Sequence, residues 1–363
     1  MKRKALLLCL VCFCTFLSGC TQKASAYTRF DTSFFDTFDT VVTILGYAKE
    51  EATFQEVCEQ ARAQFERLHT IYDGYHAYEG VANLYYMNQE AAKAPVWVEP
   101  ELFELLVYCK QYQPQMQGKV NIALGAMLSL WHEYRAVGMA SPAAAEIPPM
   151  EALIEASAHA AFDDLVLDAE AGTVFYRDPA LRIDLGCIAK GYATEKVAQW
   201  MLQSEMPSFI INAGGNVRAG NPPEDERQRW GISIQSPDAL ATGKPSENDL
   251  DILFVTNLSV VTSGDYQRYY VVDGVRYHHL ISPDTLMPGN FMRSVTVACE
   301  DSALADLYST MLFLMPFEEG IAFVEAQPGV EAYWVLMDGS IRLSSGMGAY
   351  AKSQGASSAN PMP

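Results

Sequence analysis

An acidic and a hydroxyl side chain stand four residues apart in the segment from Ser302 to Phe313, which has the pattern of a helix. At that spacing Asp306 and Thr310 project from one face, about one turn apart. A carboxylate with a hydroxyl suits a hard cation such as Mg²⁺, which binds few protein oxygens and completes its shell with phosphate and water. Asp306 could instead compensate the dipole of the helix, and for the pair alone this interpretation is favoured over a metal site.

Two glycine-containing segments could bring the backbone close to an anionic ligand. In IDLGCIAKGY, Asp184 ends an apolar strand and Lys190 stands at the start of a helix. Free N–H groups at a helix N-terminus with a nearby lysine can bind phosphate. The segment lacks GxxxxGK[ST] spacing, however, and a structural strand-to-helix turn explains it as well. In NAGGN, Gly214, Gly215 and Asn216 follow a buried strand and form either a close approach to a ligand or a tight turn.

A predicted hairpin carries groups suited to general base chemistry. One apolar strand is followed by the segment TSGDY, which contains Ser263, Gly264 and Asp265. The strand predicted to pair in the hairpin is followed by HHLISP, which contains His279 and Ile281. The hairpin can place hydroxyls, a carboxylate and an imidazole at one edge, as proton transfer requires. A lone histidine lies in a core or on a surface more often than it catalyses, so this signal is also weak alone.

The order of these segments is more specific than any one of them. IDLGCIAKGYA, INAGGN, VTSGDYQRYY with RYHHLISP, and ADLYST follow one another, after FDTFDTVVTI and VNIALGAMLSLWHEYR. From about Phe35 to Gly346 this succession resembles the ApbE family of FAD:protein FMN transferases. The resemblance implies an enzyme with an ApbE-like fold, related to T-fold proteins, that binds FAD in a cleft. It also implies Mg²⁺-dependent transfer of FMN from FAD to a Ser or Thr hydroxyl of an acceptor protein, with release of AMP.

The resemblance further implies roles for individual residues. The metal would be held by Asp306, Thr310 and the backbone carbonyl of Cys187. His279 or Asp265 would help to remove the proton of the acceptor hydroxyl. The flavin site would include the following residues: Tyr78, Asp184, Lys190, Gly214, Gly215, Asn216, Ser263, Gly264 and Ile281.

Three segments depart from the family pattern. Where the family pattern has Met-Gly-Thr, this chain has Phe38-Asp39-Thr40. Where the pattern has Gly-Gly-Asp, this chain ends the motif with Asn216. In the segment that matches Ile-Asp-Pro-x-Thr-Gly, Ser282 replaces the aspartate and Leu286 replaces the final glycine. These changes bear on loop shape and flavin contacts, whereas the predicted metal pair is intact.

Two other functions fit parts of the same pattern. In an FAD pyrophosphatase, water would replace the acceptor hydroxyl at the same metal site and release FMN and AMP. A non-enzymatic flavin- or solute-binding lipoprotein would retain FAD intact. Such binding proteins usually have two lobes of repeated βα units, which are not found here.

The elements that must position these groups indicate an α+β fold, with a mixed, largely antiparallel sheet and packed helices. Strands are predicted near 40–47, 164–167, 173–176, 181–185, 208–212, 230–235, 253–262 and 294–299, with hairpins at Asp273-Gly274 and Asp338-Gly339. Helices are predicted over 51–71, 100–112, 125–136, 151–159 and 186–204. One domain is expected over 29–346, with an exposed loop at 138–149 and a disordered tail at 347–363.

The N-terminal segment predicts export and lipidation. Three basic residues precede an apolar run from Ala5 to Leu17 and a Leu-Ser-Gly-Cys lipobox. The run is shorter than the roughly 20 residues needed to span a bilayer. We therefore expect a signal peptide over 1–19, a lipid on Cys20 and a tether over 20–28, anchored at the extracytoplasmic face of the cell membrane. The acceptor would be an extracytoplasmic protein with a flavinylation motif, for instance an electron-transfer subunit.

The charge and the cysteines narrow the function further. The formal net charge is −19, and it becomes −22 when the three basic residues of the signal peptide leave. This opposes binding to nucleic acid, so an anionic ligand would depend on local groups such as a metal or a helix N-terminus. Cys58, Cys109, Cys187 and Cys299 have no metal-ligand spacing and are expected to be buried free thiols.

Overall fold

The computed structural model describes residues 26–238 and 249–362. The helices are α2 (Glu51–Tyr72), α3 (Leu84–Glu90), α4 (Pro100–Tyr112), α5 (Gly125–Ala140), α6 (Met150–Ser157), α7 (Ala189–Met201), α9 (Ser302–Phe313) and α10 (Phe317–Glu325). The first strands are β1 (Thr28–Thr37), β2 (Thr40–Ala48), β3 (Val96–Trp97), β4 (Leu165–Asp168), β5 (Thr173–Tyr176), β6 (Phe209–Ala213), β7 (Asn216–Ala219) and β8 (Trp230–Gln235). The others are β9 (Asp249–Val255), β10 (Ser259–Gly264), β11 (Tyr269–Val272), β12 (Val275–His278), β13 (Met292–Cys299), β14 (Glu331–Leu336) and β15 (Ile341–Leu343).

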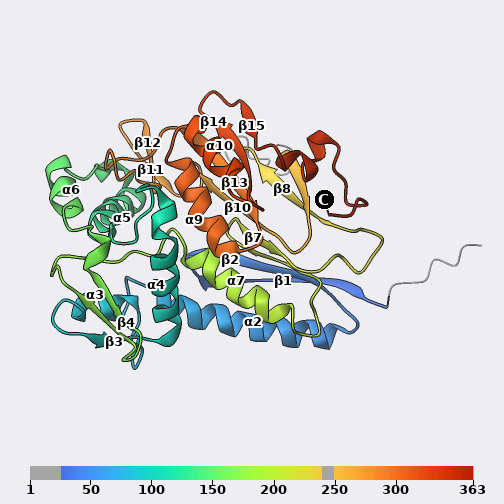
Figure 1. Ribbon diagram of the computed structural model, residues 1–363, viewed down its shortest axis with the longest axis horizontal. Coiled ribbons are helices and arrows are strands. Elements are labelled where there is room, and N and C mark those ends of the chain that lie inside the picture. The colour runs from blue at the N-terminus through green and yellow to red at the C-terminus, as the bar shows by residue number, and fades with distance from the viewer. Residues whose placement is uncertain (1–25, 239–248, 363) are drawn as a thin grey trace, which may run out of the picture.

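The main sheet has eight strands in the order β1-β2-β6-β7-β10-β13-β14-β15 (Figure 1). Every neighbouring pair in it is antiparallel. The strands β6 and β7 are joined by a two-residue turn, with Ala213 opposite Asn216. Mixed helices and a large antiparallel sheet confirm the predicted α+β class.

The two faces of the sheet are covered by different elements. Alternate residues such as Val42 and Ile44 point into the larger core, which α2, α7 and α9 cover (Figure 1). Tyr47 and Val217 point to the other face, where the β8–β9 ribbon forms a second core. Because successive side chains of a strand point to opposite faces, the sheet contributes to both cores and is buried on both faces.

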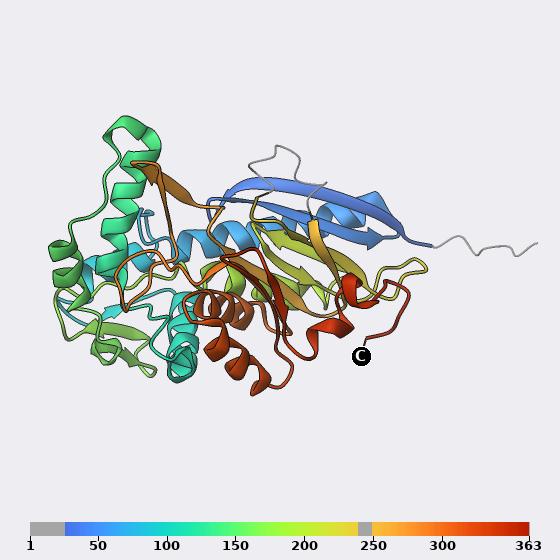
Figure 2. The ribbon, with the colours of Figure 1, turned by 90° about the horizontal axis from the view of Figure 1, so that it is seen from above.

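A third core, around Trp131, lies at one end of the molecule. It joins α5 to the β11–β12 hairpin, and Figure 2 shows the two standing side by side. The small β3-β5-β4 sheet lies near the same end, below α5 in Figure 1.

Most predicted elements occur within a few residues of their expected bounds, but two strand predictions are wrong. Residues 181–185 form no strand, because the backbone of Ile183 is bound at both its N–H and its C=O by the side chain of Asn88. The predicted strand 253–262 is two strands in different sheets. They are separated by Asn257, which has a left-handed φ of 50°.

Cys58, Cys109, Cys187 and Cys299 are free thiols, as expected; the first two and Cys299 are buried, and Cys187 is partly buried. Within residues 26–238 and 249–362, no helix is long and apolar enough to cross a membrane. Cys20 and the signal segment lie outside the described residues.

The C-terminal segment packs on the second core, in contrast to the disorder predicted for 347–363. Met347 and Ala351 are fully buried there. Arg229, only 3% exposed, donates to the carbonyl oxygens of Asn360 at 2.7 Å and Ala349 at 2.9 Å. A charged side chain inside the fold thus ties down a segment whose polar composition suggested disorder.

Replacing Arg229 with Met should destabilise the fold by about 3 kcal/mol, because buried carbonyls would lose charge-assisted hydrogen bonds. Denaturant unfolding measures this change, and limited proteolysis should show faster loss of residues 347–362. Arg342→Met is the matched control, since Arg342 is exposed and donates only to the adjacent carbonyl of Ile341. An Arg229→Met protein as stable and as protease-resistant as the wild type would contradict the assignment.

Candidate functional site

A single cavity of about 1680 Å³ contains nearly all the predicted site residues. It opens between the sheet, the start of α7, one face of α9 and the loop after α2. The predicted residues that line it are Tyr78, Asp184, Cys187, Lys190, Gly214, Gly215, Asn216, Ser263, Gly264, His279, Ile281, Asp306 and Thr310. The order of motifs along the chain therefore corresponds to one place in the fold.

Asp306 and Thr310 lie on a helix that is buried on nearly all sides. Asp306 is 4% exposed and Thr310 8% exposed. A carboxylate in such a helix is costly unless it has partners. Its Oδ2 accepts from the N–H of Gly191 at 2.9 Å and lies 3.6 Å from the Lys190 Nζ. The N–H of Gly191, in the first turn of α7, and the ammonium of Lys190 therefore stabilise the negative charge.

Hydroxyl groups adjoin this carboxylate. Thr310 Oγ1 lies 3.4 Å from Ser263 Oγ, which is also 2.9 Å from Ser309 Oγ. Among the described residues no three His, Cys, Asp or Glu side chains form a metal-binding group. One carboxylate with hydroxyls nevertheless fits Mg²⁺, which takes most of its ligands from water and phosphate.

The start of α7 is fixed by a close contact with α9. A Cβ on Gly191 would come within 2.4 Å of the carbonyl oxygen of Ser302, so only glycine fits there. Cys187, in the turn before α7, lines the cavity. Burial raises the pKa of its thiol well above the usual range. The side chain is therefore a neutral thiol, and a hard cation would use its carbonyl oxygen instead.

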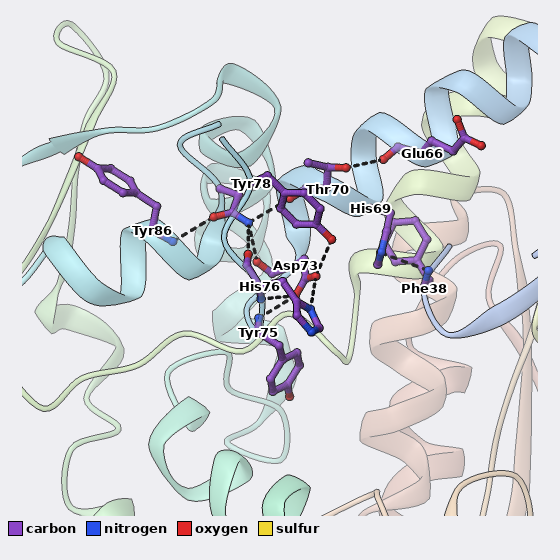
Figure 3. A network of polar contacts seen from close by, with 10 residues as sticks. Phe38, Glu66, His69, Thr70, Asp73, Tyr75, His76, Tyr78 and Tyr86 are labelled. Atoms are coloured by element: carbon purple, nitrogen blue, oxygen red, sulfur yellow. Dashed lines mark hydrogen bonds and ion pairs between the residues drawn. The ribbon is translucent and has the colours of Figure 1, made fainter. Parts of the chain in front are cut away.

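The loop after α2 is organised by the buried carboxylate of Asp73 (Figure 3). Its Oδ2 accepts from the hydroxyl of Tyr78 at 2.9 Å and lies 2.9 Å from His76 Nδ1. Burial alone would raise the pKa of Asp73, but hydrogen bonds from Tyr75, His76 and Tyr78 lower it overall. Tyr78, one of the predicted flavin-site residues, lines the cavity, and its hydroxyl is fixed by the hydrogen bond to Asp73.

Tyr75 is a second aromatic residue at the cavity, which the sequence analysis missed. Its ring stacks on His132 with centroids 4.1 Å apart, and its hydroxyl lies 3.4 Å from Asp184 Oδ2. Tyr75 points away from Asp73 in Figure 3, whereas Tyr78 points toward it. The Tyr75–His132 pair gives the wall an aromatic surface suited to a planar ring.

Two adjacent hairpin tips form the rim on the sheet side. Gly214 and Gly215 have φ of 59° and 94°, and a Cβ on Gly214 would lie 2.1 Å from Thr40 Oγ1. Opposite them, Phe38 and Asp39 also have left-handed φ, 54° and 51°.

At two of the positions that depart from the expected pattern, Asp39 and Leu286, the backbone is left-handed. Asp39 stands where the family has glycine, and its unfavourable φ costs roughly 1–2 kcal/mol. Arg268 supports this tip by donating to the carbonyl oxygens of Phe38 at 3.0 Å and Asp39 at 3.4 Å. Leu286, at the other lost glycine, likewise has φ of 60°, and its carbonyl oxygen accepts from Trp131.

His279 lies in the cavity wall with an unused ring nitrogen. Its Nδ1 is buried and has no hydrogen-bond partner among residues 26–238 and 249–362. Burial lowers the pKa of His279 well below its usual value, and the charges of Arg268 and Arg135 lower it further. The imidazole is therefore neutral at neutral pH and able to accept a proton from a ligand.

Asp265, the other predicted base, does not line this cavity. Its Oδ2 pairs with Arg293 at 2.7 Å, and it borders a separate pocket beside Pro288. β10 ends at Gly264, so the alternation that directs Ser263 into the site does not extend to Asp265. The structure therefore places the Asp265 carboxylate in a different pocket from the one that contains Asp306 and His279.

The comparisons with known proteins agree with this geometry. The model of the ApbE family matches residues 38–334. An FAD:protein FMN transferase of Klebsiella pneumoniae is 32% identical over 71% of this chain and 76% of its own length. An FAD:protein FMN transferase of Treponema pallidum is 32% identical over 72% of each chain.

Solved structures show the same fold. The ApbE protein of Thermotoga maritima superposes with a TM-score of 0.77 at 26% identity, covering 89% of this chain and 99% of its own. The flavin transferase ApbE of Vibrio cholerae does so with a TM-score of 0.73 at 23% identity, with the same coverage. With a family model that matches most of the sequence and relatives of this similarity, the chain belongs to the ApbE family.

Proposed function

We propose that this protein transfers FMN from FAD to a Ser or Thr hydroxyl of an acceptor protein, with Mg²⁺ as cofactor and AMP as the second product. The observation that carries the proposal is the arrangement of Asp306, Thr310, Lys190 and His279 in one cavity. A site for a hard cation and a neutral base then face the same ligand. The named activity of the curated relatives supports the same reaction.

The metal would be held by Asp306, Thr310 and the carbonyl oxygen of Cys187. When bound, it supplies positive charge that neutralises the pyrophosphate and the departing AMP. The protein is strongly acidic overall, so this charge must be local. Lys190, 3.6 Å from Asp306, adds a fixed cation beside the same oxygens.

The chemical step is an in-line substitution at the phosphorus of the FMN half. The acceptor oxygen forms a bond to that phosphorus, and the bond from the phosphorus to the bridging oxygen breaks. AMP leaves with the electron pair. The proton of the acceptor hydroxyl passes to His279, whose ring lines the cavity and is neutral, as a general base must be.

The cavity also has room for part of the acceptor. Ligand pockets usually measure about 300–1000 Å³, and this cavity of about 1680 Å³ is larger. It continues past the hairpin tips onto the sheet face under β8, along Thr43, Asn212 and Ser233. A short polar segment of the acceptor would fit along these residues.

The test is incubation of the mature protein with FAD and Mg²⁺, with and without a protein that carries a flavinylation motif. Mass spectrometry of the acceptor and release of AMP are followed together. A gain of one FMN per acceptor, abolished by EDTA, supports the transferase. Release of AMP and free FMN regardless of acceptor would identify a pyrophosphatase, and unchanged FAD in every sample would leave a binding protein.

We also propose that the protein acts at the extracytoplasmic face of the membrane, anchored through Cys20. The first strand begins at Thr28, so the intervening tether could extend about 25 Å. Cell fractionation tests this: a Cys20→Ala protein should leave the membrane fraction. Retention of that variant in the membrane would argue against the lipid anchor.

A further inference from the structure

Two arginines project into the cavity without a carboxylate partner. Arg135, on α5, lines the cavity, and among residues 26–238 and 249–362 its one side-chain hydrogen bond is to His132 Nδ1 at 3.2 Å. Arg268, just before β11, lines it as well and donates only to backbone carbonyl oxygens. Neither forms a salt bridge with any described residue, and neither belongs to the site predicted from the sequence.

This pairing of like charges is unusual in an acidic protein. Acidic side chains outnumber basic ones by 44 to 25. Burial lowers the pKa of Arg135, and the nearby guanidinium of Arg268 lowers it further; Asp184, which forms no ion pair with Arg135, offsets these effects only in part. Partly buried cations that repel each other need an anion between them to be stabilised. A bound anionic ligand would supply the missing charge.

The ligand is identified by the geometry of a guanidinium and by its neighbours. Guanidinium groups bind phosphate oxygens through paired N–H groups. The Tyr75–His132 stack adjoins Arg135, because His132 and Arg135 lie one turn apart on α5. An aromatic surface beside an arginine suits a ligand with a planar ring at one end and a phosphate at the other.

The position of His279 indicates which of the two phosphates of FAD lies beside Arg135 and Arg268. His279 lines the same cavity as both arginines, and its backbone N–H donates to the carbonyl oxygen of Arg268 at 3.1 Å. Both guanidinium charges also lower the pKa of His279. In the proposed reaction the base must lie beside the phosphorus that is attacked, and that phosphorus belongs to the FMN half. The metal residues Asp306 and Thr310 then face the part of the pyrophosphate that leaves with AMP.

We propose that Arg135 and Arg268 form an anion subsite that binds the phosphate of the FMN half of FAD, a role that rests on the proposed function. In this arrangement the two arginines hold the phosphoryl group that is transferred. Arg268 also links it to the strained tip at Phe38 and Asp39, whose carbonyl oxygens it already binds.

The experiment compares ligands that differ by one phosphate. Binding of FMN and riboflavin, and of AMP and adenosine, is measured by calorimetry on the mature protein in detergent with EDTA present. The wild type should prefer FMN to riboflavin, and Arg135→Met should reduce that preference by roughly 10- to 100-fold. Arg268→Met should do the same, and the preference for AMP over adenosine should change in neither.

Two further variants keep the test decisive. Arg135→Lys retains the charge but not the paired N–H groups, so its preference for FMN should lie between those of the wild type and Arg135→Met. This comparison holds even if the methionine variant is poorly folded. Arg177→Met is the control, because Arg177 is exposed and outside the cavity. An unchanged FMN preference in Arg135→Met, or a loss of AMP preference instead, would overturn the proposal. These binding measurements need neither the acceptor protein nor a metal ion. A protein that fails to transfer FMN can therefore still show the predicted phosphate preference, and the two proposals can fail independently.

Discussion

Replacing Asp306 with Ala should lower the rate of FMN transfer by about a thousandfold or more. Asp306 supplies the one carboxylate at the proposed metal site, and Thr310 and Ser263 offer only neutral hydroxyls. Without it the cation would bind weakly, and Lys190 would lose its ion-pair partner. Acceptor mass and AMP release under single-turnover conditions measure the loss. Binding of Mn²⁺, followed by electron paramagnetic resonance, should fall in parallel.

Loss of folding must be separated from loss of the metal. Asp306 accepts the N–H of Gly191, so Asp306→Asn, which keeps an acceptor oxygen, should preserve the contact between α7 and α9 better than alanine. Asp301→Asn is the control on the same helix, since Asp301 caps its N-terminus outside the cavity. Asp301→Asn should transfer FMN at the wild-type rate. A wild-type rate in Asp306→Ala would refute the metal assignment.

The sequence predicted the elements whose pattern is local. The helix beginning at 51 follows its apolar periodicity, and the helix over 302–313 also occurs where it was predicted. Failures arose where the partner of a segment lies far along the chain. The backbone of Ile183 is held by Asn88, 95 residues away, rather than by a neighbouring strand. The tail is held by Arg229, 131 residues before Asn360. Neither contact has a periodic signal.

The site residues that lie in continuous motifs were also predicted from the sequence, whereas those that depend on contacts between distant segments were not. Ordered motifs located the residues on α7, α9 and the hairpin tips, because each motif is a continuous segment. Arg135 and Arg268 were missed, although both stand in motifs that carried the resemblance, because their meeting depends on how α5 packs against β11. Asp265 was misplaced for a related reason. It follows the last residue of β10, and only its ion pair with Arg293 shows that it faces another pocket.

Replacing His279 with Gln should lower kcat for FMN transfer by about 10²- to 10⁴-fold with little change in KM for FAD, because general base catalysis contributes a factor of that order. Gln keeps polar atoms in the wall but cannot take the proton. His159→Gln is the control, since His159 pairs with Asp178 and does not line the cavity. Equal rates in the wild type and His279→Gln would exclude the base.

The pH profile gives an independent test of the same residue. Protonation removes the base, and burial with the nearby arginines holds the pKa of His279 well below its usual value of about 6.5. The wild-type kcat should therefore stay constant as the pH is lowered from 8 to about 6.5 and fall only at more acidic pH. In His279→Gln this acidic fall should disappear, because no titrating base remains. A wild-type rate that already declines between pH 8 and 7 would show that a different group, with a higher pKa, accepts the proton.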